Sequence, residues 1–423
     1  MRANHDNWAG NYTYQAARLH HPETIDQVQQ LVRHGDTLKV LGSRHSFNDI
    51  ADTTADLISL DRLEPIVAFD HARRTVTVDG GVRYGQLCEQ LHRAGYALPN
   101  LASLPHISIA GACATATHGS GVRNGNLATA VSALELVTAD GEVVALSRER
   151  HGEQFQGAVV GLGALGVVTK LTLDLVPTFM MRQDVYENLP MARLEDDFDA
   201  IVASAYSVSL FTDWQHERVS QVWVKRRVAD GASFAPEREW FGATAAPTHR
   251  HPIVSLPAEP CTEQMGIPGP WYARLPHFRM EFTPSSGEEL QTEYMLPRRH
   301  AIAAFHALDR LRDQIAPLLQ ISEVRTIAAD TLWMSPCYQQ DCVAFHFTWK
   351  KDWEAVRQLL PQIEAALAPL EARPHWGKLF TMPAAHVQSL YAKLPEFQRL
   401  LRTYDPAGKF RNAFLDRYIY AIV

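Results

Sequence analysis

One loop near the start of the chain places an imidazole among small hydrogen-bond donors. It reads Val40-Leu-Gly-Ser-Arg-His-Ser-Phe-Asn48 and continues an apolar, strand-like run over 38–41. Backbone N–H groups and short hydroxyls suit phosphate, because they donate without steric bulk. His45 is harder to explain on structural grounds, since nothing in the segment resembles a metal shell. Taken alone, it would be interpreted as a surface or capping histidine.

A second segment, 103–121, is nearly free of bulky charged residues. Its small donors and glycines are Ser108, Gly111, Thr115, Thr117, Gly119, Ser120 and Gly121. Glycine permits close approach of the backbone to a ligand. A Gly/Ser loop without a ligand is the simpler interpretation. The length and low charge of the segment favour a covered, ligand-lining role instead.

Polar residues recur at alternate positions in three strand-like segments. These are Glu323-Val-Arg325, His346-Phe-Thr348 and Gln291-Thr-Glu293. In a strand, residues two apart point to the same face, so each segment predicts a polar side. Such a side is either the solvated face of an antiparallel sheet or the wall of a polar pocket. The pattern alone does not separate these interpretations.

Lys378 ends the segment His375-Trp-Gly-Lys378. It is either a surface lysine beside a buried Trp376 or a cation inside a closed site. In a closed site, Lys378 and Arg325 could together stabilise a developing alkoxide. Desolvation and a neighbouring cation would also lower the pKa of the lysine and make it a possible base. The sequence leaves both roles open.

Periodicity predicts a mixture of strands and helices that do not strictly alternate, which indicates an α+β fold. Helices are predicted over 22–34, 84–94, 299–315 and 353–370; strands over 38–41, 57–60, 75–78, 171–177, 208–211 and 222–225; two strands joined by a turn over 132–144; and a long loop over 243–260. Gly161-Leu-Gly-Ala-Leu-Gly166 fits a dinucleotide-binding pattern. A strand-like run follows it where that motif needs a helix, so we reject this interpretation.

Bulk composition excludes several classes of protein. The 423 residues, 46% hydrophobic and 21% charged with a net charge of −7, suit two or three globular domains. No basic run, apolar membrane-length stretch or signal core occurs, so we expect a cytoplasmic protein without nucleic-acid or membrane partners, and a monomer by default. The five dispersed cysteines disfavour a disulfide framework or a zinc site. Neither G-x-S-x-G nor H-E-x-x-H is present, which argues against a hydrolase.

Four motifs in order resemble a known flavoprotein family. The loop Gly42-Ser-Arg-His-Ser-Phe-Asn48 is similar to the flavin-attachment loop of the vanillyl-alcohol-oxidase superfamily. Segments 102–121, 373–378 and 405–412 resemble the aldonolactone-oxidase branch, and within it the bacterial alditol oxidases. The similarity covers nearly the whole chain. Four motifs in the right order are far more specific than any one alone.

The resemblance implies a two-part FAD-binding domain with an inserted α+β cap domain. The expected division is 1–178 for the FAD-binding domain, 179–373 for the substrate (cap) domain and 374–423 for a C-terminal segment that returns to the first domain. It also implies FAD attached covalently through His45, which would raise the flavin potential. Arg44 and Ala116 stand where glycine is common in relatives.

The resemblance further implies a set of site residues and no metal. The cofactor would contact Val40, Leu41, Gly42, Ser43, Arg44, His45, Ser46, Ser103, Ser108, Gly111, Thr115, Ala116, Thr117, His118, Val168 and His375. The substrate would contact Ser103, Gln291, Glu323, Arg325, His346, Thr348 and Lys378, of which Gln291 and His346 are the weaker candidates. Arg325 and Lys378 would polarise the reacting hydroxyl, and Glu323 would orient Arg325.

The implied reaction is oxidation of the terminal alcohol of a linear polyol, such as xylitol or sorbitol, to the aldose. Hydride would pass to the flavin, and oxygen would then be reduced to hydrogen peroxide. The alternatives are an aldonolactone oxidase of the L-gulonolactone type, or a dehydrogenase that uses a carrier instead of oxygen. A non-catalytic flavin- or sugar-binding protein is less favoured, since binding a neutral polyol rarely needs two cations.

Overall fold

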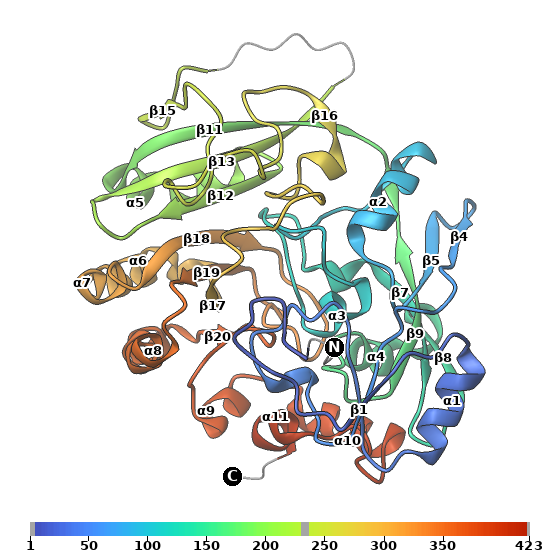
Figure 1. The fold of residues 1–423 in the computed structure, drawn as a ribbon. Helices are drawn as coiled ribbons and strands as arrows, with labels where there is room; N and C mark the ends of the chain where they lie inside the picture. Colours follow the sequence, from blue (N-terminus) through green and yellow to red (C-terminus); the bar gives the residue numbers. More distant parts are fainter. Residues whose placement is uncertain (1–4, 230–236, 421–423) are drawn as a thin grey trace.

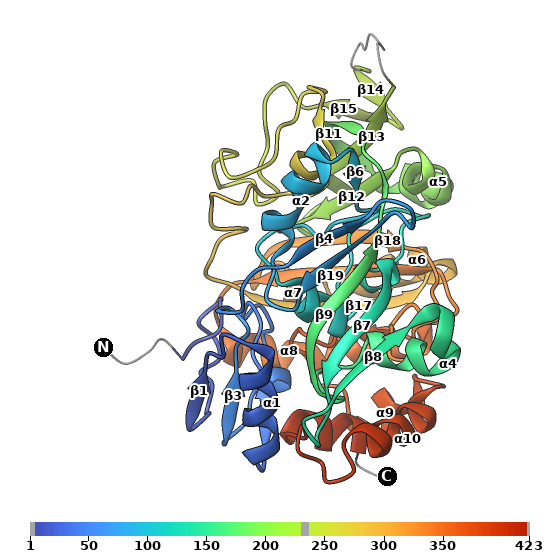
Figure 2. The ribbon, with the colours of Figure 1, turned by 90° about the vertical axis from the view of Figure 1, so that its right-hand side faces the viewer.

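The computed structural model describes residues 5–229 and 237–420. Within these ranges the strands form two large sheets and two small ones (Figure 1). The five-stranded sheet and the three-stranded sheet are built from the first 174 residues, and the ten-stranded sheet from residues 180–374. Figure 2 shows β1 and β3 of the three-stranded sheet at the lower left and the red C-terminal helices at the bottom. Mixed strands and helices confirm the predicted α+β class.

The N-terminal sheets hold ten strands. A parallel three-stranded sheet has the order β1 (Arg18–His20), β3 (Asp56–Ile58) and β2 (Leu38–Val40). An antiparallel sheet has the order β4 (Val67–Asp70), β5 (Thr75–Asp79), β9 (Val167–Asp174), β7 (Val131–Val137) and β8 (Val143–Ser147). A separate pair joins β6 (Tyr96–Ala97) and β10 (Val176–Pro177). Strand β9 begins directly after Gly166, which confirms that the glycine pattern opens a strand rather than a helix.

The ten-stranded sheet is antiparallel at every pairing of its described strands. Its order is β14 (Glu239–Trp240), β15 (Ala243–Ala245), β11 (Met180–Pro190), β13 (Arg218–Val228), β12 (Ser207–Thr212), β18 (Leu319–Ile327), β19 (Cys342–Trp349), β17 (Leu290–Pro297) and β20 (Arg373–Pro374), with β16 (Gly269–Pro270) beside β11. All eight residues of β17 and of β19 are buried, so both faces of these strands are covered.

Helices cover the outer face of this sheet (Figure 1). Phe305 of α6 packs edge-on against Phe345 of β19, with ring centroids 5.0 Å apart. The α-helices are α1 (Ile25–His34), α2 (Tyr84–Arg93), α3 (Ile109–Ala114), α4 (Arg148–Val159), α5 (Met191–Ala203), α6 (Ala301–Asp309), α7 (Arg312–Ile315), α8 (Trp353–Leu367), α9 (Ala384–Ser389), α10 (Leu394–Tyr404) and α11 (Ala413–Leu415). Among the described residues, no helix has both the length and the apolar character needed to cross a membrane.

Short 3₁₀ segments and one π-helical turn complete the helical elements. They span Asp49–Ala51, Leu127–Ala130, Trp271–Ala273, Arg298–His300 and Ala368–Leu370, and the π-helical turn spans Asp416–Tyr420.

Two secondary-structure predictions were wrong in detail. The helix predicted over 299–315 is broken, because the backbone N–H of Leu311 bonds to the carbonyl of Leu308 at 2.9 Å. That three-residue spacing is a 3₁₀-type bond, which tightens and ends a helix. The loop predicted over 243–260 begins with the short strand β15.

The C-terminal segment packs back against the N-terminal part. The carbonyl of Lys409 accepts the backbone N–H of Leu38 at 2.9 Å. The Asn412 amide donates to the carbonyls of Asp49, Ile50 and Asp52 at 2.9–3.1 Å. We therefore propose that the chain divides at about residues 178 and 373, with the C-terminal segment completing the first domain.

Candidate active site

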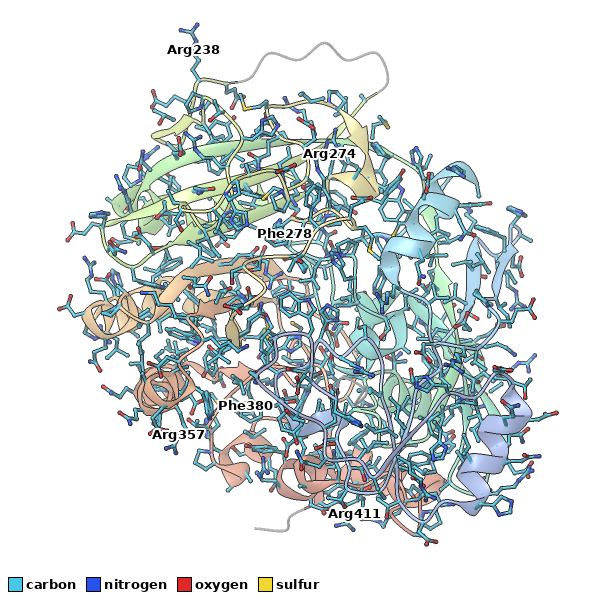
Figure 3. All side chains as sticks on the ribbon, viewed as in Figure 1. Arg238, Arg274, Phe278, Arg357, Phe380 and Arg411 are labelled. Carbon is cyan, nitrogen blue, oxygen red and sulfur yellow. The ribbon has the colours of Figure 1, made fainter. Side chains whose placement is uncertain are left out.

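One cavity lies between the N-terminal loops and the inner face of the ten-stranded sheet. Residues of β17, β18 and β19 line it on one side, and the loop around His45 lines the other. Figure 3 shows Phe278, another residue of the cavity wall, near the centre of the molecule. Glu293 is 1% exposed and Arg325 is 6% exposed, so this polar face is covered. The solvated-face interpretation of the alternating pattern is therefore wrong.

His45 lies on the cavity wall with neither ring nitrogen bonded. Its ring stacks on Trp8, with centroids 5.5 Å apart and planes 15° from parallel. Both nitrogens are buried and have no hydrogen-bond partner. Burial lowers the pKa of His45 to about 3, so its imidazole is neutral and has a free lone pair. A buried polar atom without a partner usually indicates a missing ligand or a functional role.

The two small-residue loops meet beside His45. The Ser43 hydroxyl accepts the backbone N–H of Ser108 at 2.9 Å, which ties the loops together. A Cβ atom added to Gly42 would lie 2.7 Å from the Ser108 Oγ, and one added to Gly111 would lie 2.8 Å from it. A side chain at either position would therefore displace the Ser108 hydroxyl from its present place. The uncharged donors, the glycines and the unpartnered imidazole fit a flavin dinucleotide.

Most predicted cofactor residues line this cavity. They are Val40, Leu41, Gly42, Ser43, Arg44, His45, Ser46, Ser103, Ser108, Gly111, Thr115, Thr117, His118 and His375. Val168 lines an adjoining cavity that shares residues 40–43 with the first. Ala116 is absent from the lining of both cavities, and its backbone φ of 53° falls in the left-handed region that favours glycine. Arg44 has the same conformation, with φ of 62°.

Strand register gathers the polar residues at the other end of the cavity. His346 on β19 is paired with Glu293 on β17 and with Glu323 on β18. Thr348 is paired with Gln291. Directly opposed residues of an antiparallel pair have neighbouring side chains. Three strands that are distant in sequence thus place their polar side chains in one row.

Glu293 connects the two cations of the site. Its Oε1 accepts from Arg325 Nη2 at 2.6 Å, and its Oε2 accepts from Lys378 Nζ at 2.7 Å. The His118 Nε2 lies 3.2 Å from the same Oε1. Burial alone would raise the pKa of Glu293, but Lys378 and Arg325 outweigh burial and hold it well below its usual range. Glu293 is therefore a carboxylate held between the guanidinium of Arg325 and the ammonium group of Lys378.

A short chain of hydrogen bonds runs from Lys378 into the cavity. Lys378 Nζ lies 2.6 Å from His346 Nδ1, and His346 Nε2 lies 3.0 Å from the Thr348 hydroxyl. Burial and Lys378 hold the pKa of His346 well below its ordinary value, so this histidine is neutral. It accepts from Lys378 at Nδ1 and donates from Nε2 to Thr348. Burial, reinforced by Arg325, also lowers the pKa of Lys378 itself, although Glu293 opposes this change.

Arg325 uses only two of its five N–H donors in hydrogen bonds to neighbouring side chains. Its Nη1 donates to the Ser103 hydroxyl at 3.0 Å, whereas its buried Nε has no hydrogen-bond partner. Glu323 Oε1 lies 3.6 Å from that Nε and accepts from His277 Nε2 at 2.7 Å. Burial opposes the charge on Arg325, but Glu323 and Glu293 prevail and raise its pKa. The guanidinium is thus a permanent cation with a donor free to meet a ligand oxygen.

Sequence reasoning missed several residues of this site. Glu293 closes the motif Gln291-Thr-Glu293, so the alternation that singled out Gln291 was a sufficient signal for it. His277 lies in an irregular segment, so no periodicity indicated a role for it. Lys225 ends the strand predicted over 222–225, and nothing in that pattern indicated that the lysine is buried. Gln291 itself lines the cavity, but its amide donates to Glu289.

The described part of the chain contains no cluster of three or more histidine, cysteine, aspartate or glutamate side chains that could hold a metal ion. The polar end of the cavity holds cations, carboxylates and neutral imidazoles. Two buried cations beside a covered pocket can stabilise negative charge that develops on a substrate oxygen, because water does not screen them.

Two family models match the chain. One, described as an FAD binding domain, covers residues 16–147, and one described as D-arabinono-1,4-lactone oxidase covers residues 286–418. The chain is 51% identical over 413 residues to an alditol oxidase from a Streptomyces species, with 97% of both chains covered. It is 29% identical to an L-gulono-1,4-lactone dehydrogenase from Mycobacterium tuberculosis, with 98% of both chains covered.

The fold is similar to that of a solved cholesterol oxidase from B. sterolicum. The TM-score is 0.75 at 14% sequence identity, and the match covers 98% of this chain and 96% of the other. At that identity the similarity concerns the fold alone. It agrees with the α+β architecture built around an FAD-binding part.

Proposed function

The chain belongs to the alditol oxidase family, in the aldonolactone-oxidase branch of the vanillyl-alcohol-oxidase flavoproteins, and we propose that it oxidises the terminal alcohol of linear polyols to the aldose. The observation that carries this proposal is the pair of largely buried cations, Arg325 and Lys378, bridged by Glu293 at 2.6 and 2.7 Å. The cavity that holds them also reaches His45. Alcohol and flavin can therefore meet in one covered space.

We propose that FAD is held covalently through His45. A neutral imidazole with both nitrogens unpartnered has the lone pair that bond formation requires. The loops that meet at Ser43 and Ser108 supply small donors without bulk. Bound FAD supplies the hydride acceptor and passes the electrons on to oxygen.

We propose that Arg325 and Lys378 bind the reacting hydroxyl and assist its deprotonation. Arg325 contributes N–H groups beyond its bonds to Ser103 and Glu293, and Lys378 retains donor capacity beyond its bonds to Glu293 and His346. As the hydroxyl gives up its proton to solvent, the two cations stabilise the alkoxide in a pocket of low dielectric. Glu293 fixes both cations in place by holding one on each oxygen.

The remaining polar residues would hold the rest of the polyol. Glu323 accepts from substrate hydroxyls and orients Arg325, while Thr348 offers its own hydroxyl proton, since it already accepts from His346. Ser103 is fixed by Arg325 and would hold the polyol from the substrate side of the flavin. Linear polyols present hydroxyls at regular intervals, which suits a row of alternating acceptors and donors.

The test is anaerobic mixing of the purified flavoprotein with xylitol, sorbitol and L-gulono-1,4-lactone. We expect the flavin absorbance to bleach with the polyols and much more slowly with the lactone. Bleaching by the lactone alone would establish the aldonolactone alternative, and no bleaching by any polyol would refute the proposal. Readmission of air then separates an oxidase, which reoxidises within seconds, from a dehydrogenase, which takes many minutes.

A further inference from the structure

A second buried lysine–histidine pair lies on the far side of Glu323. Lys225 of β13 is fully buried and donates to the carbonyls of Leu275 and Pro276, at 2.5 and 3.1 Å. Its Nζ also lies 3.0 Å from His277 Nδ1. The three protons of an ammonium group are thus matched by three acceptors. Nothing in the proposed reaction uses this lysine directly.

The lysine determines which nitrogen of His277 carries the proton. Because Nδ1 accepts from Lys225, the proton of the neutral ring lies on Nε2. That nitrogen donates to Glu323 Oε1 at 2.7 Å. Phe211 and Trp223 hold the ring edge-on, with centroids 5.6 and 5.1 Å away. The arrangement repeats that of Lys378, where a lysine also donates to Nδ1 of a histidine.

Charged groups around the pair keep His277 neutral. Burial, followed by the charge of Lys225, lowers the pKa of His277 to about 4, although Glu323 opposes the change. Burial lowers the pKa of Lys225 to about 7. The other titratable or charged groups that act on the pair are Cys261, Arg274 and Arg325. Removing Lys225 therefore removes a charge that disfavours protonation of His277.

We propose that Lys225 is a positioning residue for polyol oxidation: it holds His277 neutral with its proton on Nε2, so that His277 aims the Glu323 carboxylate at Arg325 and the substrate hydroxyls. This inference rests on the proposed function, in which Glu323 contacts the substrate. Without Lys225, the pKa of His277 rises, so the ring takes up a second proton at a less acidic pH than in the wild type. An imidazolium would then pair with Glu323 more tightly and withdraw it from the substrate.

The experiment compares flavin reduction by xylitol in the wild type, Lys225→Met, His277→Gln and the double variant. Rates are measured anaerobically between pH 5 and 9. We expect Lys225→Met to reduce the rate about 10- to 100-fold, as loss of one hydrogen bond to a charged group would. The rate of Lys225→Met relative to the wild type should fall further at acidic pH, because His277 then becomes protonated in the variant. The double variant should react as fast as His277→Gln alone and lack this acid limb, because Lys225 acts only through His277.

The controls separate positioning from folding. Lys170→Met removes a lysine of β9 that pairs with Glu135 at 2.9 Å outside the cavity, and its rate should match the wild type. Lys225→Gln keeps a donor without the charge and replaces Lys225→Met if that variant does not fold. Rates within twofold of wild type in the Lys225 variants, or additive losses in the double variant, would overturn the inference. Failure of the wild type to react with any polyol would instead overturn the proposed function.

Discussion

Replacing Glu293 with glutamine tests whether one buried carboxylate organises the site. Its two oxygens lie 2.6 and 2.7 Å from Arg325 and Lys378, and the residue is 1% exposed. An amide cannot balance two buried cations. Removing one partner of a buried ion pair costs about 3–5 kcal/mol. For 423 residues the unfolding entropy is about 0.9 kcal/mol/K, so the thermal midpoint should fall by about 3–6 °C.

The same change should affect chemistry and pH dependence. Glu293 is the group that most raises the pKa of Lys378, so Glu293→Gln leaves a smaller fraction of charged lysine. We expect flavin reduction by xylitol to slow about 100-fold, as when one preorganised donor to a developing oxyanion is lost. Because the pKa of Glu293 is depressed in the folded state, its stabilisation is complete above about pH 4.3 and is lost as the pH falls further. The difference in thermal midpoint should therefore be full at pH 7 and shrink in acid.

Glu364 provides a matched control for this experiment. It is 6% exposed, accepts from the Tyr294 hydroxyl and Thr381, and forms no ion pair among the described residues. Burial raises its pKa, so an amide replaces it at little cost. Glu364→Gln should change the midpoint by less than about 1.5 °C and leave flavin reduction unaltered. Equal effects of the two substitutions would refute the role given to Glu293, as would a Glu293→Gln enzyme that is destabilised but reacts at the wild-type rate.

Two further predictions concern the cofactor and the second cation. His45→Ala should release its flavin into the supernatant on acid precipitation, whereas the wild-type pellet should stay yellow; a yellow His45→Ala pellet would place the bond elsewhere. Lys378→Met should slow flavin reduction by xylitol about 100- to 1000-fold. Since burial lowers the pKa of Lys378, the wild-type rate should fall on the alkaline side as the ammonium loses its proton, and this limb should vanish in Lys378→Met. A wild-type rate that instead rises as the Lys378 ammonium loses its proton would identify Lys378 as the base.

Local periodicity predicted which side chains share a face of a strand. Glu323 and Arg325 were placed together for this reason, as were His346 and Thr348, and each pair lines the cavity. Whether the face meets water could not be predicted, because that depends on segments far away in the sequence. The loop around His45 lies on the opposite wall of the cavity and covers this face of the strands. The spacing of two residues is identical in a solvated strand and a buried one.

Strand register and irregular segments also limited what could be predicted about the site from the sequence. The row of Glu293, His346 and Glu323 depends on how three strands pair, and a shift of one residue would turn each side chain to the opposite face. His277 lies in a segment without periodicity, so nothing in the sequence connects it to Lys225. A lysine inside a strand pattern is ordinarily exposed, and only the carbonyls of residues 275 and 276 make its burial possible.

The charge of the pocket is better explained by the reaction than by binding. Arg325 and Lys378 line the pocket beside the carboxylates Glu293 and Glu323 and are largely withdrawn from water. An uncharged polyol gains little from these ions, and burying each charge costs several kcal/mol. The substrate becomes negative only as its hydroxyl loses a proton. The cost of the buried cations is therefore offset at that step, where an alkoxide forms beside them.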